Sequence, residues 1–239
     1  SIKIMCRMLA YVGKDKEKLK KLAQCLILSA KDDPITHDVH KDGWGIVAYD
    51  GEKVVYYRSV SPIFNESDIL FNLISLLNGN LKVIIHARLA TDKNLVSSYL
   101  SHPYMESNEK SIIYFAHNGS VNKEDLGKIL NIDSRLMVDS ELIGKYLVSR
   151  GIEKVKELQA YTKSALNLFI LKIDRESKDA NLYYYNYYNV DYIRKKGTPE
   201  EYYYLYHGED YVFSSSLAYS GCEKGNKVNF GELEELKSS

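Results

Sequence analysis

The sequence is poor in cysteine and proline and has no net charge, and these shortages exclude several classes of protein. Its 239 residues include three cysteines and four prolines, and its 32 acidic side chains balance its 32 basic ones. Three widely spaced cysteines do not suggest a disulfide framework, which favours a reducing, cytoplasmic compartment. We expect Cys25 in the apolar core of a helix and Cys222 in an exposed loop. A formal net charge of zero also lacks the basic surplus typical of a nucleic-acid-binding protein.

Long hydrophobic runs and metal-ligand motifs are missing as well. The apolar runs 26–30 and 81–85 are far too short to cross a bilayer, and no signal-peptide pattern is present. No Cys-x-x-Cys or His-Glu-x-x-His motif occurs, so we expect no metal and no cofactor. These observations predict a cytoplasmic protein that engages neither membranes nor nucleic acid.

Tyrosine is unusually frequent, with 21 copies concentrated in the C-terminal third. Tyrosine favours strands and carries a polar hydroxyl on an apolar ring. We interpret the excess as strands with amphipathic outer faces, and an aromatic interaction surface is the alternative.

Hydrophobic spacing predicts helices and strands along most of the chain. Strands often follow one another without an intervening helix, which favours antiparallel sheets packed against helices. We therefore expect a single α+β domain over residues 1–239, with a core of about 6–222 and a loosely held tail at 223–239. The expected helices are 16–30, 67–77, 123–130 and 140–149, and the expected strands are 6–12, 44–49, 53–58, 82–87, 111–116, 165–173, 181–188, 201–206 and 211–214.

Polar residues gather in six short segments that packing alone does not require. Five of the six histidines lie in or beside these segments. Each segment alone is a weak signal, whereas their order and spacing together are specific. The segments are Cys6-Arg7, His40–Gly45, His86–Thr91, His102–Tyr104, His117–Gly119 and Asp139–Glu141.

In this order the segments resemble the glutaminase domain of class II glutamine amidotransferases, in the stand-alone branch of that family. The family belongs to the N-terminal-nucleophile (Ntn) hydrolases. The resemblance covers residues 6 to 141 and implies a four-layer αββα sandwich of two mainly antiparallel sheets, with the nucleophile at the start of the first strand. It also implies glutamine or a γ-glutamyl small molecule as the substrate.

Taken residue by residue, the resemblance implies a complete amide-hydrolysing site. Cys6 would attack the amide carbonyl, with its own α-amino group acting as the base. Asn118 and Gly119 match the oxyanion hole, which donates hydrogen bonds to the developing negative oxygen. Arg88 matches the clamp on the glutamine α-carboxylate, and Asp139 matches the acceptor of the α-ammonium. Supporting residues expected to line the site are Thr91, His102 and Trp44.

Each of the main site residues also has a plainer structural explanation. Cys6 could be a core thiol, and Arg88 could be one half of a structural ion pair. Asn118-Gly119 could be a simple turn, and Asp139 could be only the N-cap of a helix that begins at Ser140. We favour the functional interpretation because all of these residues occur together in the order of the family motifs.

The residues before Cys6 raise a separate question, because the mechanism needs a free amine on the nucleophile. In this sequence Ser1–Met5 precede Cys6, and the nitrogen of an internal cysteine is an amide that is not a base. We expect Met5 to be an initiator residue whose removal exposes Cys6. A short propeptide and a non-catalytic relative are the alternatives.

Three functions are compatible with these residues. The favoured one is hydrolysis of the glutamine side-chain amide through a Cys6 thioester, releasing glutamate and ammonia, with a separate synthetase subunit as the ammonia acceptor. The second is an amidohydrolase of γ-glutamyl compounds that works without ammonia transfer. The third is a catalytically inactive subunit that keeps the glutamine pocket for binding or regulation. The motifs alone do not separate the first two, since both use the same residues.

Overall fold

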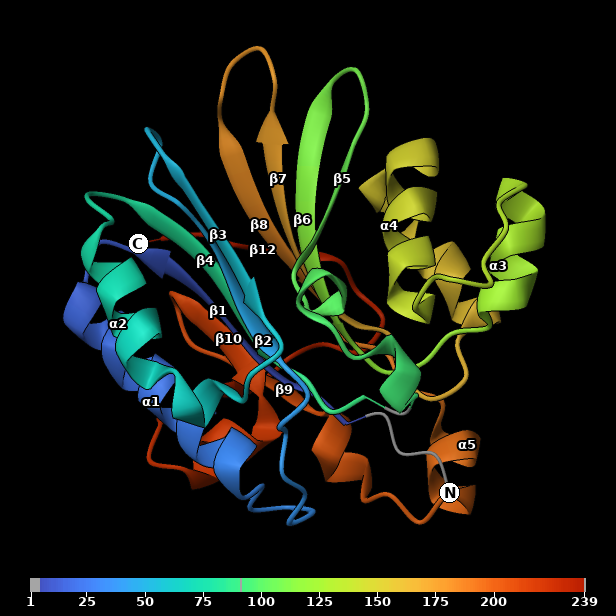
Figure 1. The fold of residues 1–239 in the computed structure, drawn as a ribbon, viewed down its shortest axis with the longest axis horizontal. Coiled ribbons are helices and arrows are strands. Elements are labelled where there is room, and N and C mark those ends of the chain that lie inside the picture. The colour runs from blue at the N-terminus through green and yellow to red at the C-terminus, as the bar shows by residue number, and fades with distance from the viewer. Residues whose placement is uncertain (1–4, 91, 239) are drawn as a thin grey trace.

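The computed structural model describes residues 5–90 and 92–238, which form two antiparallel β-sheets packed face to face between helices (Figure 1). The larger sheet has seven strands in the order β11-β9-β10-β1-β4-β2-β3. Its central strand β1 pairs along its whole length with β4. The strands of this sheet are β1 (Arg7–Gly13), β2 (Trp44–Tyr49), β3 (Val54–Ser59), β4 (Leu81–Ala87), β9 (Leu205–His207), β10 (Tyr211–Ser214) and β11 (Asn226–Lys227).

The smaller sheet has five strands in the order β12-β8-β7-β6-β5. The long strands β6 and β7 pair over eight residues at its centre. All pairs in both sheets are antiparallel, as the sequence predicts. The strands of this sheet are β5 (Tyr104–Ser107), β6 (Ser111–Asn118), β7 (Asn167–Asp174), β8 (Ala180–Tyr185) and β12 (Glu234–Leu236).

Helices cover the outer face of each sheet and complete four layers (Figure 1). The helices α1 (Lys16–Lys31) and α2 (Ser67–Ser75) cover the larger sheet, and α3 (Lys123–Leu130) and α4 (Asp139–Arg150) cover the smaller one. A fifth helix, α5 (Val190–Lys195), lies at the end of the sheets near the start of β1. Short 3₁₀ helices occupy Ile63–Asn65, Lys93–Leu95, Ser98–Leu100, Ile152–Tyr161, Glu200–Tyr203 and Ser215–Tyr219.

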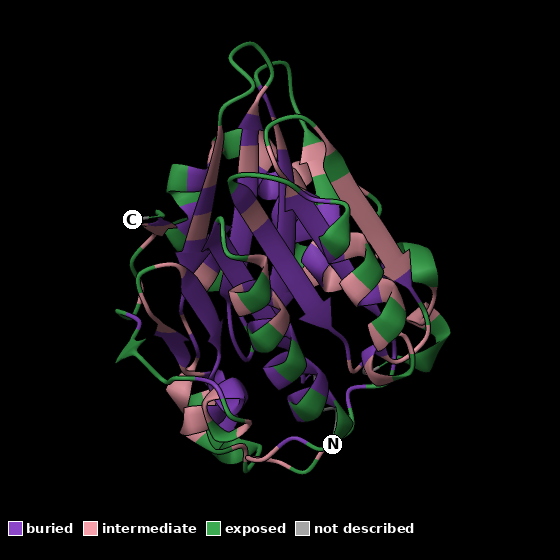
Figure 2. Ribbon diagram, turned by 90° about the vertical axis from the view of Figure 1, so that its left-hand side faces the viewer, coloured by how far each residue is buried: buried purple, intermediate pink, exposed green. Residues whose placement is uncertain are grey.

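Alternation along the strands builds a separate apolar core between each pair of layers. In β1, Leu9 and Tyr11 point toward α1, while Met8, Ala10 and Val12 point toward the smaller sheet. Successive side chains of a strand face opposite sides, so a strand buried on both faces is apolar at every position. Figure 2 shows the resulting pattern, with buried strands inside and exposed outer faces on the helices. Within residues 5–90 and 92–238, every helix is too short or too polar to span a bilayer.

The elements predicted by hydrophobic spacing are present up to β8, with small shifts at their ends. The C-terminal part differs more. The predicted strand 201–206 begins as the 3₁₀ helix Glu200–Tyr203, and β5, β11, β12 and α5 were not anticipated. The segment after Cys222, expected to be a loosely held tail, pairs with both sheets through β11 and β12. Its side chains Val228 and Leu236 are buried between the sheets.

Many of the C-terminal tyrosines are core residues and do not form an interaction surface. Tyr185, Tyr202, Tyr203 and Tyr206 are each less than 5% exposed. The expectation that they mark only the outer faces of strands is wrong. They belong to three different apolar clusters: Tyr206 packs beneath α1, Tyr185 packs beneath α4, and Tyr202 and Tyr203 pack against Met5 and Ile193.

The structure also corrects the expectation that the cysteines are unpaired. Cys25 in α1 and Cys222 form a disulfide, with their Cα atoms 6.1 Å apart. Cys222 is buried and does not lie in the exposed loop that we expected. A separation of 197 residues gives no local pattern from which the pair could be predicted. Cys6 is therefore the free cysteine of the chain.

Candidate active site

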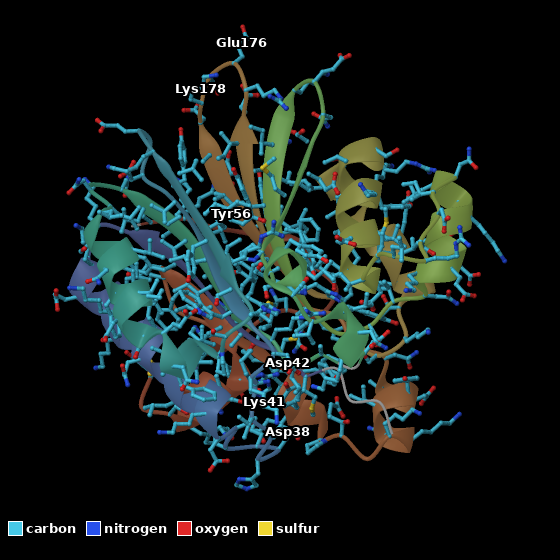
Figure 3. All side chains as sticks on the ribbon, viewed as in Figure 1. Asp38, Lys41, Asp42, Tyr56, Glu176 and Lys178 are labelled. Atoms are coloured by element: carbon cyan, nitrogen blue, oxygen red, sulfur yellow. A yellow bond between two sulfur atoms is a disulfide. The ribbon has the colours of Figure 1, made fainter. Side chains whose placement is uncertain are left out.

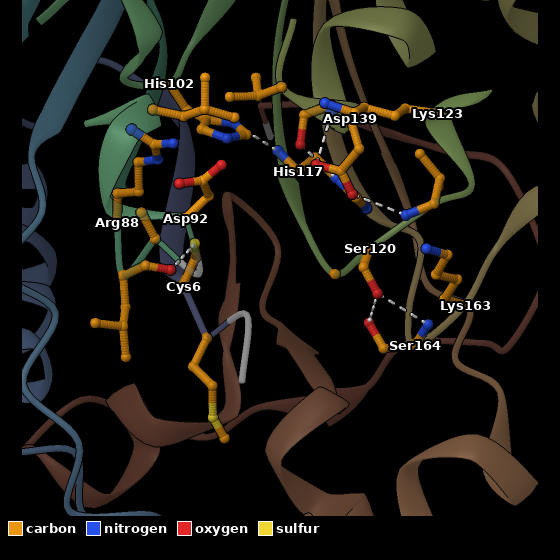
Figure 4. A pocket seen from close by; sticks show the side chains of 18 of the residues that line it. Cys6, Arg88, Asp92, His102, His117, Ser120, Lys123, Asp139, Lys163 and Ser164 are labelled. Atoms are coloured by element: carbon orange, nitrogen blue, oxygen red, sulfur yellow. Dashed lines mark hydrogen bonds between the residues drawn. The ribbon is translucent and has the colours of Figure 1, made fainter. Parts of the chain in front are cut away.

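A cavity of about 300 Å³ lies where the start of β1 meets the ends of β4 and β6 (Figure 4). Cys6 directly precedes β1, Arg88 directly follows β4, and Gly119 directly follows β6. All three residues line the cavity. The sandwich therefore gathers at one end of its sheets three motif segments that are spread over more than a hundred residues of the sequence.

Cys6 is buried at the base of this cavity, and its contacts hold it from two sides. Its backbone N–H donates to Asn118 Oδ1 at 3.2 Å, and its Sγ lies 4.0 Å from the carbonyl oxygen of Leu89. Burial raises the pKa of the Cys6 thiol to about 11, although the Leu89 contact and the charge of Arg88 oppose the shift. At neutral pH the thiol is therefore protonated unless a nearby base removes its proton.

Asn118 presents an unused hydrogen-bond donor beside Cys6. Its side chain is fully buried, Oδ1 accepts the Cys6 N–H, and Nδ2 has no partner in the described part of the chain. A buried amide nitrogen without a partner is costly and uncommon outside functional sites. The next residue, Gly119, has φ = +135°, and a Cβ there would lie 2.0 Å from the Ala165 carbonyl oxygen. This turn therefore admits only glycine, and the backbone can approach the cavity closely.

Arg88 and Asp139 reach the cavity from different walls (Figure 4). Arg88 is 6% exposed, and its Nη1 is buried without a partner among the described residues. Asp139 Oδ2 accepts the Val121 N–H at 2.9 Å, and Oδ1 accepts the Ser140 N–H at 3.0 Å. Asp139 is the first residue of α4 and Val138 is the N-cap, so the alternative that Asp139 is only the N-cap of a helix beginning at Ser140 is wrong.

Three buried histidines lie together at the cavity, and two of them, His102 and His117, line it. The His86 and His102 rings stack with their centroids 4.0 Å apart. The backbone N–H of His117 donates to the ring Nδ1 of His102 at 3.2 Å. Burial lowers the pKa of His86 to about 3 and the pKa of His102 well below its usual value. These rings are therefore uncharged at neutral pH. Burial lowers the pKa of His117 as well, so neither of the two rings that line the cavity is suited to take up a proton there.

The loop after β4 is held by the Asp-Gly-Trp-Gly segment. Asp42 Oδ2 accepts the Ala90 N–H at 2.9 Å and pairs with Lys93, while the Arg88 N–H donates to the Gly43 carbonyl at 2.9 Å. Figure 3 shows Asp42 at the site end of the molecule and Glu176 at the opposite tip. The segment thus positions the backbone that carries Arg88.

Of the predicted site residues, Cys6, Arg88, His102, Gly119 and Asp139 line the cavity. Asn118 contacts Cys6 but is not a lining residue, and Trp44 and Thr91 stand apart from this group. Trp44 is fully buried on β2, donates from Nε1 to Glu66 Oε1 at 2.9 Å, and packs in the core beneath α1 and α2. It does not line the cavity. Thr91 lies outside the described residues.

The sequence did not predict a buried ionic cluster that lies next to Cys6. Arg7 donates from Nε to the Cys6 carbonyl at 2.8 Å, and Asp33 Oδ2 lies 3.8 Å from the same Nε. Asp33 also accepts from Ser216 and from His40 Nε2, whose Nδ1 lies 2.7 Å from the Met5 carbonyl. Arg7, Asp33 and His40 are completely buried. The cluster therefore holds the backbone on both sides of the Cys6 side chain.

Charges within this cluster keep Asp33 ionised despite its burial. Burial raises the pKa of an isolated carboxyl group. Here the hydrogen bond from His40 and the charge of Arg7 outweigh burial, and the pKa of Asp33 lies well below its usual value. The sequence offered a partial signal, because Arg7 and His40 lie in the motif segments, but nothing marked Asp33.

A second group that the sequence reasoning missed lies on the cavity wall away from Arg88. The side chains of Lys123, Lys163 and Lys196 all line the cavity, and Figure 4 shows Lys123 and Lys163 across it from Cys6. They come from segments outside the six motifs. Among the residues that the structure describes, no cluster of histidine, cysteine and acidic side chains could hold a metal ion.

Comparisons with known proteins agree with this geometry. The family model described as class-II glutamine amidotransferases matches residues 5–161, which is more than half of the chain. No curated protein sequence matches significantly.

Two solved structures share the fold with a TM-score of 0.62 each. One is the glutamine phosphoribosylpyrophosphate amidotransferase of B. subtilis complexed with ADP and GMP, at 17% identity over 98% of this chain and 50% of that chain. The other is described as the allosteric regulatory enzyme of purine biosynthesis, at 18% identity over 95% of this chain and 46% of that chain. The chain thus spans about half the length of both proteins.

A predicted glutamine amidotransferase from Pseudomonas aeruginosa PA01 matches over 100% of this chain and 97% of that one, at 12% identity and a TM-score of 0.38, which is too low to add to the argument. The two-sheet likeness at a TM-score of 0.62 confirms the α+β sandwich of the Ntn-hydrolase type. With the family model covering the motif segments, the chain belongs to the class-II glutamine amidotransferase family.

Proposed function

We propose that the protein hydrolyses the side-chain amide of glutamine through a thioester on Cys6, releasing glutamate and ammonia. The observation that carries the proposal is the unpartnered amide nitrogen of Asn118, buried on the same side chain that holds the Cys6 N–H. A donor kept free beside a nucleophile is the arrangement needed to stabilise an oxyanion, and it costs no reorganisation during the reaction.

In the proposed reaction, the α-amino group of Cys6 accepts the thiol proton, and Sγ attacks the amide carbonyl carbon of the substrate. The resulting oxyanion accepts hydrogen bonds from Asn118 Nδ2 and from the Gly119 N–H. The C–N bond then breaks, the amine returns the proton to the leaving nitrogen, and ammonia departs from the thioester. A water molecule hydrolyses the thioester to glutamate and regenerates the Cys6 thiol.

Specificity for the glutamyl part comes from opposite charges at its far end. Arg88 would pair with the α-carboxylate, since its Nη1 is buried and unpartnered. Asp139 would accept the α-ammonium from the facing wall. An isolated charge in such a cavity is costly, so a substrate that carries both charges is strongly favoured.

Activity in this mechanism depends on a free amine at Cys6. With Met5 attached, the nitrogen of Cys6 is an amide, and burial holds the pKa of the thiol at about 11. A free α-amine has an unperturbed pKa of about 8 and would supply the missing base. We therefore propose that only the form that begins with Cys6 is active.

The experiment compares the chain carrying Met5 with the form that begins with Cys6. We expect glutamate release from glutamine, and covalent labelling of Cys6 by diazo-oxo-norleucine, in the second form alone. The variant Cys6→Ala should lose both. Equal activity in the two forms would exclude the amine as the base, and labelling elsewhere in the chain would discredit Cys6.

A second candidate function, amide hydrolysis of γ-glutamyl compounds without ammonia transfer, is favoured by one observation. The cavity does not end at the glutamyl-binding charges but continues to the wall formed by Lys123, Lys163 and Lys196. Glutamine loses only ammonia, which needs no such wall. Release of ammonia from glutamine, to be used by a separate synthetase subunit, supports the first function. Faster release of a larger amine supports the second, and binding without turnover supports an inactive regulatory subunit.

A further inference from the structure

We propose that the lysine wall of the cavity binds a carboxylate carried by the amine that leaves, so that the preferred substrates are γ-glutamyl amides of amino acids. This inference rests on the proposed amide hydrolysis at Cys6 and names the class of leaving group. It concerns Lys123, Lys163 and Lys196, which have no role in the reaction proposed at Cys6.

Three separate segments bring these lysines to one wall. Lys123 opens α3, and its Nζ is anchored by the Met137 carbonyl at 3.0 Å. Lys163 follows the bridge between Val121 and Thr162, and its N–H donates to the Ser120 carbonyl at 2.8 Å. Their backbones are thus fixed relative to each other and to the turn that carries Gly119.

Lys196 closes this wall from the end of α5. It is the C-cap residue of that helix, and its Nζ lies 5.6 Å from the centre of the Tyr192 ring. The floor between the lysines and the nucleophile is formed by Ser120 and Ser164, whose hydroxyls are 2.8 Å apart. The floor is therefore polar and well defined.

The charges on this wall are not balanced within the cavity. None of the three lysines makes an ion pair in the described part of the chain. The acidic side chains that line the cavity are Asp92, which Figure 4 shows between Arg88 and Cys6, and Asp139, which takes two backbone N–H groups. The whole chain has a formal net charge of zero, so this local surplus is not a general basic bias.

Lys163 and Lys196 are exposed and Lys123 is half-buried, so this wall is the solvent-facing rim of the cavity. Three cations without an acidic partner at the rim of a concave site attract an anion, because their fields add there. The α-carboxylate of the glutamyl group is already assigned to Arg88. The remaining part of a γ-glutamyl amide is the substituent on the nitrogen that leaves. In the hydrolysis that substituent departs as a free amine, with the thiol proton on its nitrogen, while its carboxylate stays unchanged throughout.

The test uses two substrates that differ in one charge, γ-glutamylglycine and γ-glutamylglycinamide, with the form of the chain that begins with Cys6. We expect kcat/KM, measured as glutamate release, to favour γ-glutamylglycine by about tenfold, since hydrogen bonds to charged groups are stronger than those between neutral groups. Raising the ionic strength from about 0.01 M to about 0.5 M should reduce this preference. Equal values for the two substrates would overturn the proposal.

The double variant Lys163→Gln, Lys196→Gln should lower the preference to about twofold or less, because kcat/KM falls for γ-glutamylglycine more than for γ-glutamylglycinamide. The matched control is Lys195→Gln, which removes a neighbouring exposed lysine that does not line the cavity, and it should keep the full preference. A preference that survives the double variant would contradict the assignment.

A binding measurement separates this proposal from the proposed function. Calorimetry with the full-length Cys6→Ala variant should show tighter binding of γ-glutamylglycine than of γ-glutamylglycinamide. If both substrates are hydrolysed equally well and bind equally well, only the lysine assignment fails. If no amide is hydrolysed and Cys6 resists diazo-oxo-norleucine, the proposed function fails. In that case, tighter binding of γ-glutamylglycine than of γ-glutamylglycinamide to Cys6→Ala would still support the anion site, and equal binding would reject it.

Discussion

At the scale of single residues, the position of Cys6 and its reactivity are set by different neighbours. Its position comes from Asn118, which accepts its N–H, and from Arg7, which donates to its carbonyl. Its reactivity is suppressed by burial, which raises the pKa of the thiol to about 11. A well-placed nucleophile can therefore be inert until a base is supplied next to it.

The role of Asn118 leads to the first prediction. In the form that begins with Cys6, Asn118→Ala should lower kcat for glutamate release by about 10²–10³, with a much smaller change in KM, because the lost donor acts on the transition state. The control is Asn122→Ala, which removes the N-cap of α3 and should cost about 1 kcal/mol of stability without changing kcat. An Asn118→Ala variant with the parent kcat would remove Asn118 from the oxyanion hole.

Asp33 provides the second prediction at this scale. Asp33→Asn should lower the free energy of unfolding by about 3–5 kcal/mol at pH 7, because it leaves the buried charge of Arg7 without its partner. The pKa of Asp33 is lower in the folded than in the unfolded chain, so its contribution is complete above its unfolded value of about 3.9 and is lost as the pH falls toward its folded value.

Urea unfolding of the parent and of Asp33→Asn, between pH 7 and pH 3, should therefore show a difference that narrows in acid. The neighbouring Asp32→Asn serves as a control, since the Asp32 side chain is 72% exposed and should contribute less than about 0.5 kcal/mol. A difference for Asp33→Asn that stays constant across this pH range would contradict the linkage.

At the scale of elements, the C-terminal segment is tied to the first helix by the disulfide between Cys25 and Cys222. The helix α1 itself could be predicted from the sequence, because it has a standard N-cap and regular apolar spacing. Asp15 caps its first turn by accepting from the Lys18 N–H, and apolar residues recur at helical spacing. Its covalent partner, in contrast, lies beyond the 3₁₀ helix Ser215–Tyr219 and has no local signature.

The disulfide leads to the third prediction. Cys222→Ser should lower the free energy of unfolding by about 2–4 kcal/mol, because the bond restricts the unfolded chain over a very long loop. Adding dithiothreitol to the parent should lower its melting temperature in the same way, and should leave that of Cys222→Ser unchanged. If the melting temperature of the parent is insensitive to dithiothreitol, the bond is absent or contributes nothing to stability.

At the scale of the whole molecule, the two sheets are held together by a shared apolar layer to which both ends of the chain contribute. Met8 and Val12 of β1 meet Phe169 of β7 in this layer, and the late residues Val228 and Leu236 extend it. The layer positions the start of β1 against the end of β6. The site thus depends on packing across the sandwich.

The fourth prediction tests whether the last residues belong to this core. Leu236→Ala should cost about 2–5 kcal/mol in urea unfolding, as expected for a buried leucine that leaves a cavity. Leu136→Ala, at a site that is 89% exposed, should change the stability by less than about 0.5 kcal/mol. Similar small values for both variants would show that β12 is only loosely attached.

Much of the element pattern could be predicted because it depends on near neighbours. The periods of α1 and of the hairpin β2–β3, with its Asp50-Gly51 turn, reflect local geometry that any window of the sequence contains. The motif segments supplied the order of the site residues in the same way. The resemblance of those ordered segments to class II amidotransferases then implied amide hydrolysis by Cys6, Arg88, Asn118 and Asp139.

Only the tertiary structure decided which distant groups meet. It joined Asp33 to Arg7 and Cys25 to Cys222, and it placed Trp44 in a core away from the cavity. It also assembled the lysine wall from three segments with no common motif. Such contacts depend on how the layers stack and on where the strands end. The spacing of residues along the sequence does not determine either of these. The sequence therefore determined the family, while packing decided how Cys6 is held and which side chains line the rest of the cavity.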